Sequence, residues 1–83
     1  MADLHRLTVL LIIPAYNATE WIVRTIDSLK SQTHHNIQIT VVDDASTDNT
    51  AELAAMCAVK LLTHDVNRGT YAAINTALAY AID

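Results

Sequence analysis

Three short apolar runs organise the chain, and each is followed by a polar turn and a stretch with helical spacing. The runs are Leu7–Ile13, Ile37–Asp43 and Val59–Leu62. The first run is rich in leucine and β-branched residues and shows no alternation of polar and apolar positions, which is typical of a strand buried on both faces. We expect Pro14 to end the first strand, because proline cannot donate a ladder hydrogen bond.

The first helix is predicted between the first two strands. Asn17 and Glu20 have the spacing of a capping box, so we expect a helix that begins at Asn17 and ends near Gln32. Trp21, in its first turn, is expected to pack in the core, with a place at the edge near the ligand as the alternative. The apolar face predicted from three- and four-residue spacing comprises Ile22, Val23, Ile26, Leu29 and Thr33.

Two more helices are predicted after the second and third strands. The second is expected to begin at a cap formed by Ser46 or Asp48 and to end near Cys57. The third is expected to span Thr70–Ile82, where several alanines favour helix. The predicted inner faces are Leu53, Ala54 and Cys57 in the second helix, and Tyr71, Ile74, Leu78 and Ala81 or Ile82 in the third.

The element order is therefore β-α-β-α-β-α over a single domain, residues 1–83. Parallel strands joined by right-handed crossover helices form a sheet that is covered on both faces. If each helix connects neighbouring strands, the strand order is 3-2-1. The sequence thus predicts an α/β fold in three layers, α/β/α, which is half of a doubly wound, Rossmann-like fold.

The composition is that of a folded domain with a small core. Of the 83 residues 52% are hydrophobic and 17% are charged, and 5 Lys and Arg against 9 Asp and Glu give a formal net charge of −4. A groove that binds nucleic acid needs clustered basic residues, and here they are scattered, so we expect no nucleic-acid partner. The basic residues are Arg6, Arg24, Lys30, Lys60 and Arg68.

Cysteine usage and hydropathy limit the remaining classes of protein. Cys57 is the only cysteine, which excludes an internal disulfide and a cysteine-based zinc site. The Leu7–Ile13 run is too short to span a bilayer and lacks a cleavage site, so we expect a cytoplasmic protein, with membrane association through other parts of a complete protein left open. His34 and His35 are neighbours that point in different directions, so we expect loop residues there and not metal ligands.

Polar side chains gather where the predicted strands end, and ligands of open α/β sheets bind at the carboxyl ends of the strands. An aromatic ring can stack on a base, a carboxylate can accept an N–H from the base edge, and a guanidinium can pair with phosphate. Together such groups can hold a nucleotide. The alternative is structural, with the acids ending a strand and capping a helix. The residues concerned are Tyr16, Asn17, Asp43, Asp44, Asn67 and Arg68.

Several common motifs are missing from the chain. The turn after the first strand, Pro14–Ala18, contains neither G-x-G-x-x-G nor G-x-x-x-x-G-K-[ST], and no G-x-S-x-G is present. These absences argue against dinucleotide-binding Rossmann enzymes, P-loop NTPases and α/β-hydrolases. A phosphoacceptor receiver domain is rejected because it needs acids directly after the first strand, where Pro14 and Tyr16 stand.

Four segments in order make the chain resemble family 2 glycosyltransferases. They are Leu11–Asn17 (LIIPAYN), Ser28–Thr33 (SLKSQT), Val41–Thr50 (VVDDASTDNT) and Asn67–Thr70 (NRGT), the last followed by Asn75. Together they cover essentially the whole chain. The resemblance implies the nucleotide-binding portion of an inverting, GT-A-fold enzyme that uses a nucleotide-diphospho-sugar, with a UDP-sugar as the expected donor.

The resemblance also implies roles for individual residues. Tyr16, in the P-x-Y-N turn, would lie against the base, and the second acid, Asp44, would bind the base. Asp43 would support it, and Arg68 matches a position that often approaches the nucleotide or diphosphate. The complete set of expected donor-binding residues is Pro14, Ala15, Tyr16, Asn17, Asp43, Asp44 and Arg68.

The chain departs from the family pattern in two ways. Ala45 stands where glycine is usual, so we expect a tighter or stiffer turn. The family's Asp-x-Asp metal motif and general base would come after Asp83, so we expect no catalytic residue and no metal site in this chain, and Mg²⁺ or Mn²⁺ only in the complete enzyme. The 83 residues are then expected to recognise the nucleotide but not to transfer the sugar alone.

Two other functions use the same pattern. One is a non-catalytic module that binds nucleotides or proteins, and the other is a small α/β domain without a site. Metal-dependent hydrolysis of a nucleotide-sugar would separate the transferase from the module. Under the transferase interpretation Leu7–Ile13 is an exposed apolar edge, which predicts a homo-oligomer formed through that strand, such as a two-fold dimer.

Overall fold

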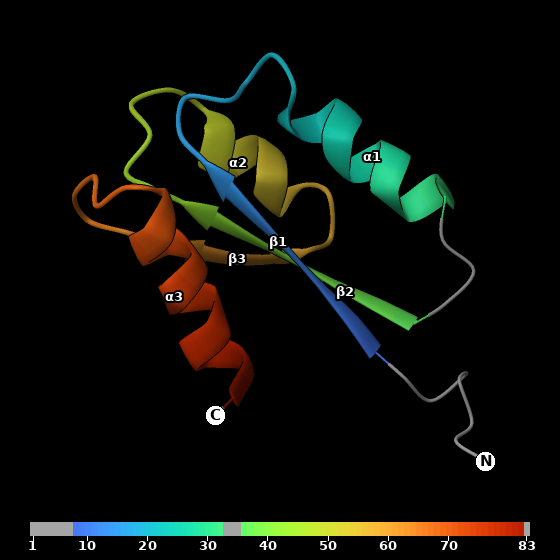
Figure 1. The fold of residues 1–83 in the computed structure, drawn as a ribbon. Helices are drawn as coiled ribbons and strands as arrows, with labels where there is room; N and C mark the ends of the chain where they lie inside the picture. The colour runs from blue at the N-terminus through green and yellow to red at the C-terminus, as the bar shows by residue number, and fades with distance from the viewer. Residues whose placement is uncertain (1–7, 33–35, 83) are drawn as a thin grey trace.

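The predicted order of elements is confirmed. The computed structural model describes residues 8–32 and 36–82 and contains three strands and three helices (Figure 1). Leu7, Thr33 and the pair His34 and His35 lie outside the described residues, so the expectations for them stay predictions. The elements are β1 (Thr8–Ala15), α1 (Ile22–Gln32), β2 (Asn36–Asp43), α2 (Thr50–Ala55), β3 (Lys60–Thr63) and α3 (Thr70–Ile82).

The three strands form one parallel sheet in the order β1-β2-β3, which is the predicted order 3-2-1 read from the other edge. β1 pairs along its whole length with β2, ending at Ala15 opposite Asp43. β3 pairs only with the second half of β2, ending at Thr63 opposite Asp43. All three strands therefore end at the same edge of the sheet.

Alternate side chains of the sheet enter two separate cores. α1 and α2 cover one face, and α3 covers the other (Figure 1), so the three-layer architecture is confirmed. Both faces of the sheet therefore bury apolar side chains. The larger core contains Ile13, Ala15, Ala18, Ile22, Ile26, Ile39, Val41 and Ala54, and the smaller one contains Val42, Ala73 and Ala77, with Ile12 and Leu62 packed against it.

The prediction that Pro14 ends the first strand is wrong, because β1 continues through Pro14 to Ala15. The Ala15 carbonyl accepts a hydrogen bond from Asp44 N–H at 2.8 Å, so Ala15 directs its backbone groups toward β2. In a parallel strand the backbone groups of successive residues point to opposite sides. Pro14 therefore faces the edge of β1 that carries no strand among the described residues, where a missing N–H breaks no hydrogen bond.

The predicted capping box at Asn17 is also wrong. Asn17 adopts a left-handed conformation with φ 50°, and α1 is entered through a turn in which Ile22 N–H donates to the Ala18 carbonyl at 2.9 Å. Trp21 is exposed rather than packed in the core. The apolar face of α1 is otherwise as predicted, because Ile22 and Ile26 are fully buried.

α3 has the predicted length but presents a different face to the sheet. Ala73 and Ala77 are buried, whereas Tyr71 is 86% exposed and Leu78 is 42% exposed. Small side chains let the helix backbone lie close to the sheet, and the larger apolar residues then face outward. The periodicity of apolar residues identified the helix, but it did not identify the inner face.

α2 is shorter than predicted, since it ends at Ala55 and not near Cys57. Asn49 occupies the N-cap position without a side-chain cap, while the Asp48 carboxylate accepts a hydrogen bond from Thr50 N–H at 3.0 Å. Of the predicted inner face, Ala54 is buried, and Leu53 and Cys57 pack against the larger core, which they share with α1.

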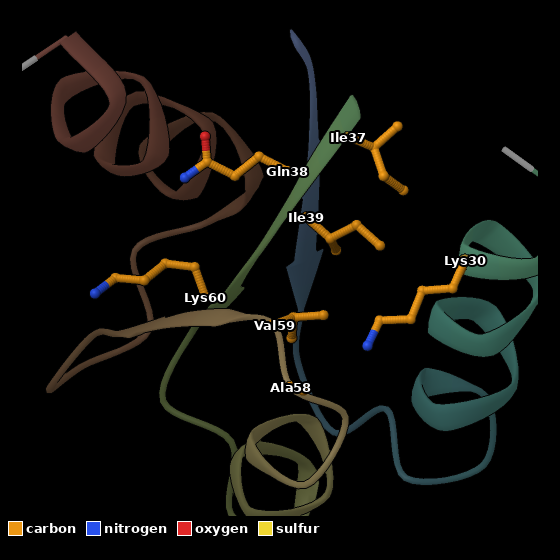
Figure 2. A pocket seen from close by; sticks show the side chains of 7 residues that line it. All are labelled: Lys30, Ile37, Gln38, Ile39, Ala58, Val59 and Lys60. Atoms are coloured by element: carbon orange, nitrogen blue, oxygen red, sulfur yellow. The ribbon is translucent and has the colours of Figure 1, made fainter. Parts of the chain in front are cut away.

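A cavity of about 260 Å³ lies near the amino ends of β2 and β3, away from the edge where the strands finish. β3 covers only the second half of β2, so the first half of β2 borders this cavity (Figure 2). Ile37, Ile39 and Val59 point toward the side of Lys30, whose ammonium group donates to the Cys57 carbonyl.

No helix within residues 8–32 and 36–82 is long and apolar enough to cross a membrane.

Candidate functional site

Hydrogen bonds join the turn after β1 to the turn after β2. Asn17 N–H donates to the Ser46 hydroxyl at 2.9 Å, and the Asn17 side-chain oxygen accepts from Thr47 N–H at 2.9 Å and from the Thr47 hydroxyl at 3.2 Å. The left-handed conformation of Asn17 is one that asparagine tolerates better than most residues. Asn17 therefore ties two turns that are 30 residues apart in the sequence.

Thr50 makes the second connection between these turns and was not predicted from the sequence. Its buried hydroxyl accepts a hydrogen bond from Ala18 N–H at 2.7 Å, and its O–H donates to the Asp48 carboxylate. The hydroxyl hydrogen bond from Thr50 is the first cause of a lowered pKa of Asp48. A residue of α2 thus holds the turn that leads into α1, whose first N–H group bonds to the Ala18 carbonyl.

Asp43 closes β2 as a buried carboxylate that is only partly satisfied. Its side chain is nearly inaccessible, with the residue 5% exposed. Oδ2 accepts a weak hydrogen bond from Ser46 N–H at 3.3 Å, whereas Oδ1 has no hydrogen-bond partner in the part of the chain that the structure describes. A buried carboxylate oxygen without a donor is costly, and such an atom needs a partner such as a ligand or a water molecule.

Asp44 is surrounded by donors from the loop between β3 and α3. Its Oδ1 accepts hydrogen bonds from His64 Nδ1 and Arg68 N–H, and its Oδ2 accepts from Gly69 N–H, each at 2.8 Å. Gly69 has φ 92°, a conformation that side chains rarely adopt. The side-chain amide of Asn67 also donates to the Asp44 carbonyl at 3.4 Å.

These donors keep Asp44 ionised. The pKa of the Asp44 carboxyl lies below its ordinary value, first because of the hydrogen bond from His64 and then because of the backbone donor at Arg68. Burial opposes this shift, and the donor at Gly69 adds to it. The carboxylate is therefore negative at neutral pH and can only accept hydrogen bonds.

His64 is the residue of this cluster that sequence reasoning missed. Its side chain is 5% exposed, and it joins Asp44 on one side to the Thr76 hydroxyl on α3, with Nε2 to Oγ1 at 2.7 Å. The one available signal was its position directly after β3, at the same sheet edge as the acid pair. That position alone does not distinguish a buried histidine from a solvated one.

Comparison with protein families determines where this chain belongs. The family described as "Glycosyl transferase family 2" matches residues 10–83. The chain belongs to this glycosyltransferase family. The resemblance seen in the four sequence segments is thereby confirmed.

Two relatives illustrate the range of family 2 proteins that are similar to this chain. An uncharacterized glycosyltransferase of Rickettsia felis is 39% identical over 83 residues, which covers 95% of this chain and 14% of the relative. The UDP-Glc:alpha-D-GlcNAc-diphosphoundecaprenol beta-1,3-glucosyltransferase WfgD of Escherichia coli is 41% identical over 74 residues, which covers 86% of this chain and 29% of the relative. The chain spans less than a third of the length of either protein.

A solved structure confirms the GT-A fold. The mannosyltransferase PcManGT from Pyrobaculum calidifontis, in complex with GDP-Man and Mn²⁺, matches with a TM-score of 0.82 and 31% sequence identity. The match covers 87% of this chain and 24% of that chain.

The predicted donor-binding residues of this family 2 chain all lie at the carboxyl end of the sheet. Asn17, Asp43 and Asp44 belong to the bonded turns described above. Tyr16 follows β1 and is 49% exposed. Arg68 donates its backbone N–H to Asp44, and the residue is exposed. The predicted contact of its guanidinium with the nucleotide or diphosphate stays a prediction.

A metal ion would need several donor side chains in one place. Within the described ranges, no group of three or more His, Cys, Asp or Glu residues is placed to hold one. Asp43 and Asp44 do not form such a group, and the donors around Asp44 are N–H groups, which repel a cation. The described residues therefore do not fit the Mg²⁺ or Mn²⁺ expected of a complete enzyme.

Proposed function

We propose that this chain is the nucleotide-recognising part of a family 2 glycosyltransferase that uses a nucleotide-diphospho-sugar, with a UDP-sugar as the first candidate. Family membership supports the proposal. So do the nucleotide-sugars printed in the names of two similar proteins, UDP-Glc for WfgD and GDP-Man for PcManGT. The observation that carries it is the pair of buried carboxylates with unused acceptor positions beside an exposed tyrosine.

The acid pair offers hydrogen-bond acceptors for the edge of a base. A carboxylate has about four acceptor positions, and three of those on Asp44 are taken, which leaves one on Oδ2. In the same acid pair, Asp43 Oδ1 is buried and accepts no hydrogen bond from any residue that the structure describes. An N–H of a base would compensate the desolvation of either atom, and a ligand without such a donor would not.

Tyr16 and Arg68 would contact the remaining parts of the nucleotide. The exposed ring of Tyr16 can lie flat against the base, and Pro14 and Ala15 border it with backbone. The exposed guanidinium of Arg68 can pair with the diphosphate, since arginine suits phosphate geometry. In this proposal the chain binds and orients the donor, and it supplies no group that activates the acceptor hydroxyl.

We also propose that two copies of the chain can associate through β1. The outer edge of β1 carries no strand among residues 8–32 and 36–82, and Val9 near its start is exposed. An unpaired apolar strand offers N–H and C=O groups to a second strand. Antiparallel pairing about a two-fold axis would satisfy both copies.

The test of nucleotide binding is calorimetric titration with UDP and with GDP, each with and without Mn²⁺. We expect saturable binding by the unsubstituted chain, and we expect Tyr16→Ala to weaken it by about 1–3 kcal/mol, the usual value of base stacking on an aromatic ring. Because Tyr16 is exposed, the substitution should leave the thermal unfolding midpoint unchanged.

Tyr80→Ala is the matched control for this titration. Tyr80 is a partly exposed tyrosine at the far end of α3, where Lys60 Nζ lies 4.5 Å from its ring centre. We expect the control to bind nucleotide as the unsubstituted chain does. Equal weakening by both substitutions would contradict a role for Tyr16, and no saturable binding to either nucleotide would contradict the proposed function.

A further inference from the structure

His64 links the acid pair to α3 through both of its ring nitrogens. Nδ1 lies 2.8 Å from Asp44 Oδ1, and Nε2 lies 2.7 Å from Thr76 Oγ1. The side chain is 5% exposed, so both contacts are shielded from water. Asp44 and Thr76 are separated by 32 positions in the sequence and are joined here by one side chain.

The hydrogen-bond partners of the His64 ring show which ring nitrogen carries a proton. The Asp44 carboxylate is ionised and only accepts hydrogen bonds, so Nδ1 carries a proton and donates it to Oδ1. The Thr76 hydroxyl can donate to Nε2 or accept from it, and so it satisfies the ring in either protonation state. An apolar residue of similar size would fill the space without holding the carboxylate.

The orientation of Asp44 depends on this bond. The backbone donors at Arg68 and Gly69 approach from the loop, while His64 approaches from the end of β3. With Oδ1 occupied by two donors, the unused acceptor position is on Oδ2. α3 is held against the sheet by Ala73 and Ala77, so Thr76 is a firm anchor for the ring.

We propose that His64, anchored by Thr76, is a positioning residue of the nucleotide site, which holds the Asp44 carboxylate so that the free position on Oδ2 faces the ligand. The inference rests on the proposed function and deepens it, because it adds a residue that does not touch the nucleotide. The lowered pKa of the Asp44 carboxyl, for which the hydrogen bond from His64 is the first cause, agrees with the geometry.

A matched pair of substitutions separates positioning from packing. In His64→Asn the side-chain amide nitrogen takes the place of Nδ1 and can still donate to Asp44. In His64→Gln the side-chain amide nitrogen takes the place of Nε2 near Thr76, and the hydrogen bond to Asp44 Oδ1 is lost. Both variants replace a buried ring by a smaller amide, so both are expected to lower the thermal unfolding midpoint to a similar extent.

Two measurements are made on both variants and on the unsubstituted chain. The first is the affinity for UDP or GDP, whichever binds the unsubstituted chain more tightly. We expect His64→Gln to weaken it about tenfold or more, the effect of losing a hydrogen bond to a charged group, and His64→Asn to stay within about threefold. The second is a carbon-detected NMR titration of the Asp44 carboxyl, in which His64→Gln should raise the pKa and His64→Asn should leave it low.

The outcomes distinguish this inference from the proposed function. Equal loss of affinity in both variants, or an Asp44 pKa that His64→Gln leaves unchanged, overturns the positioning role. If the unsubstituted chain binds neither nucleotide, the proposed function fails, and the role in ligand binding fails with it. The NMR titration needs no nucleotide, so it decides separately whether His64 controls the charge of Asp44.

Discussion

Single residues in left-handed conformations shape the turns at the carboxyl end of the sheet. Asn17 and Ala45 have φ of 50° and 62°, and both belong to the turns that hold the acid pair. A left-handed conformation costs an L-amino acid about 1–2 kcal/mol, and glycine escapes this cost. The position where the family usually has glycine is therefore occupied by a strained alanine.

Ala45→Gly is expected to stabilise the fold. Relief of the left-handed strain outweighs the extra chain entropy of glycine in the unfolded state, so the free energy of unfolding should rise by about 0.5–1 kcal/mol. Urea unfolding monitored by circular dichroism measures the change. Ala79→Gly in the exposed face of α3 is the control, and it should lower the free energy of unfolding by about 1 kcal/mol. Destabilisation by both would show that Ala45 is not strained.

The ionised state of Asp44 predicts how stability depends on pH. Its pKa is lower in the folded chain than the ordinary 3.8, so the folded state binds the proton less readily than the unfolded state. The stabilisation is fully present above the unfolded pKa and is lost as the pH falls through the folded pKa. Asp48 contributes in the same direction through its hydrogen bond from Thr50.

Urea unfolding between about pH 6 and about pH 2 tests this dependence. The unsubstituted chain should lose stability below about pH 4, and Asp44→Asn and Asp48→Asn should each make the loss shallower. Asp27→Asn, which removes an exposed carboxylate on α1, should follow the unsubstituted chain. An unchanged slope in Asp44→Asn would contradict the hydrogen-bond network around Asp44.

At the scale of elements, α3 is held by its smallest residues. Ala73 and Ala77 face Val42 of β2, while Tyr71 and Leu78 face outward. A helix that lies this close to a sheet leaves little space for a longer side chain, because protein interiors are closely packed. The inner face is therefore decided by the distance between layers and not by the hydrophobicity of single residues.

Ala77→Leu tests which face of α3 is buried. The larger side chain should overpack the smaller core and lower the free energy of unfolding by about 1–3 kcal/mol. Leu78→Ala is the control, and it should cost less than about 1 kcal/mol because Leu78 is 42% exposed and lies outside both cores. Urea unfolding compares the two variants. A larger loss of unfolding free energy in Leu78→Ala than in Ala77→Leu would show that the inner face is the one predicted from the periodicity.

At the scale of the whole molecule, the sheet is narrow for a doubly wound fold. It has three strands, and β1 and β3 each have a second edge that is unpaired among the described residues. β1 is the longer of the two, with 8 residues against 4. Because Pro14 already faces outward, the carboxyl end of β1 is blocked, and its first half is the part that can pair.

Sedimentation velocity over a range of concentrations tests association through β1. We expect the unsubstituted chain to shift from monomer toward dimer as concentration rises. Leu10→Pro should keep the chain monomeric, because Leu10 faces the same side as Pro14 and directs its N–H to the outer edge and not to β2. Circular dichroism must show that the fold is retained. A clean monomer of the unsubstituted chain at high concentration would contradict the proposal.

The order of elements, the parallel sheet and the location of the acid pair could be predicted from local patterns in the chain. These features depend on local composition: continuous apolar runs form buried strands, and small polar residues after them form turns. The family was also visible in short segments such as Val41–Thr50. The helix at Thr70–Ile82 was predicted with its observed bounds, because alanine-rich helical patterns are strong local signals.

Which side chains come into contact depends on how the whole chain packs. The donors to Asp44 come from positions 20 to 25 residues further along the chain, and Asn17 bonds to a turn 30 residues away instead of capping its own helix. His64 meets Asp44 because β2 and β3 end together, and Ala77 belongs to the smaller core because α3 packs on the sheet. Distances between layers and partners across turns arise from packing the whole chain, and no local pattern contains them.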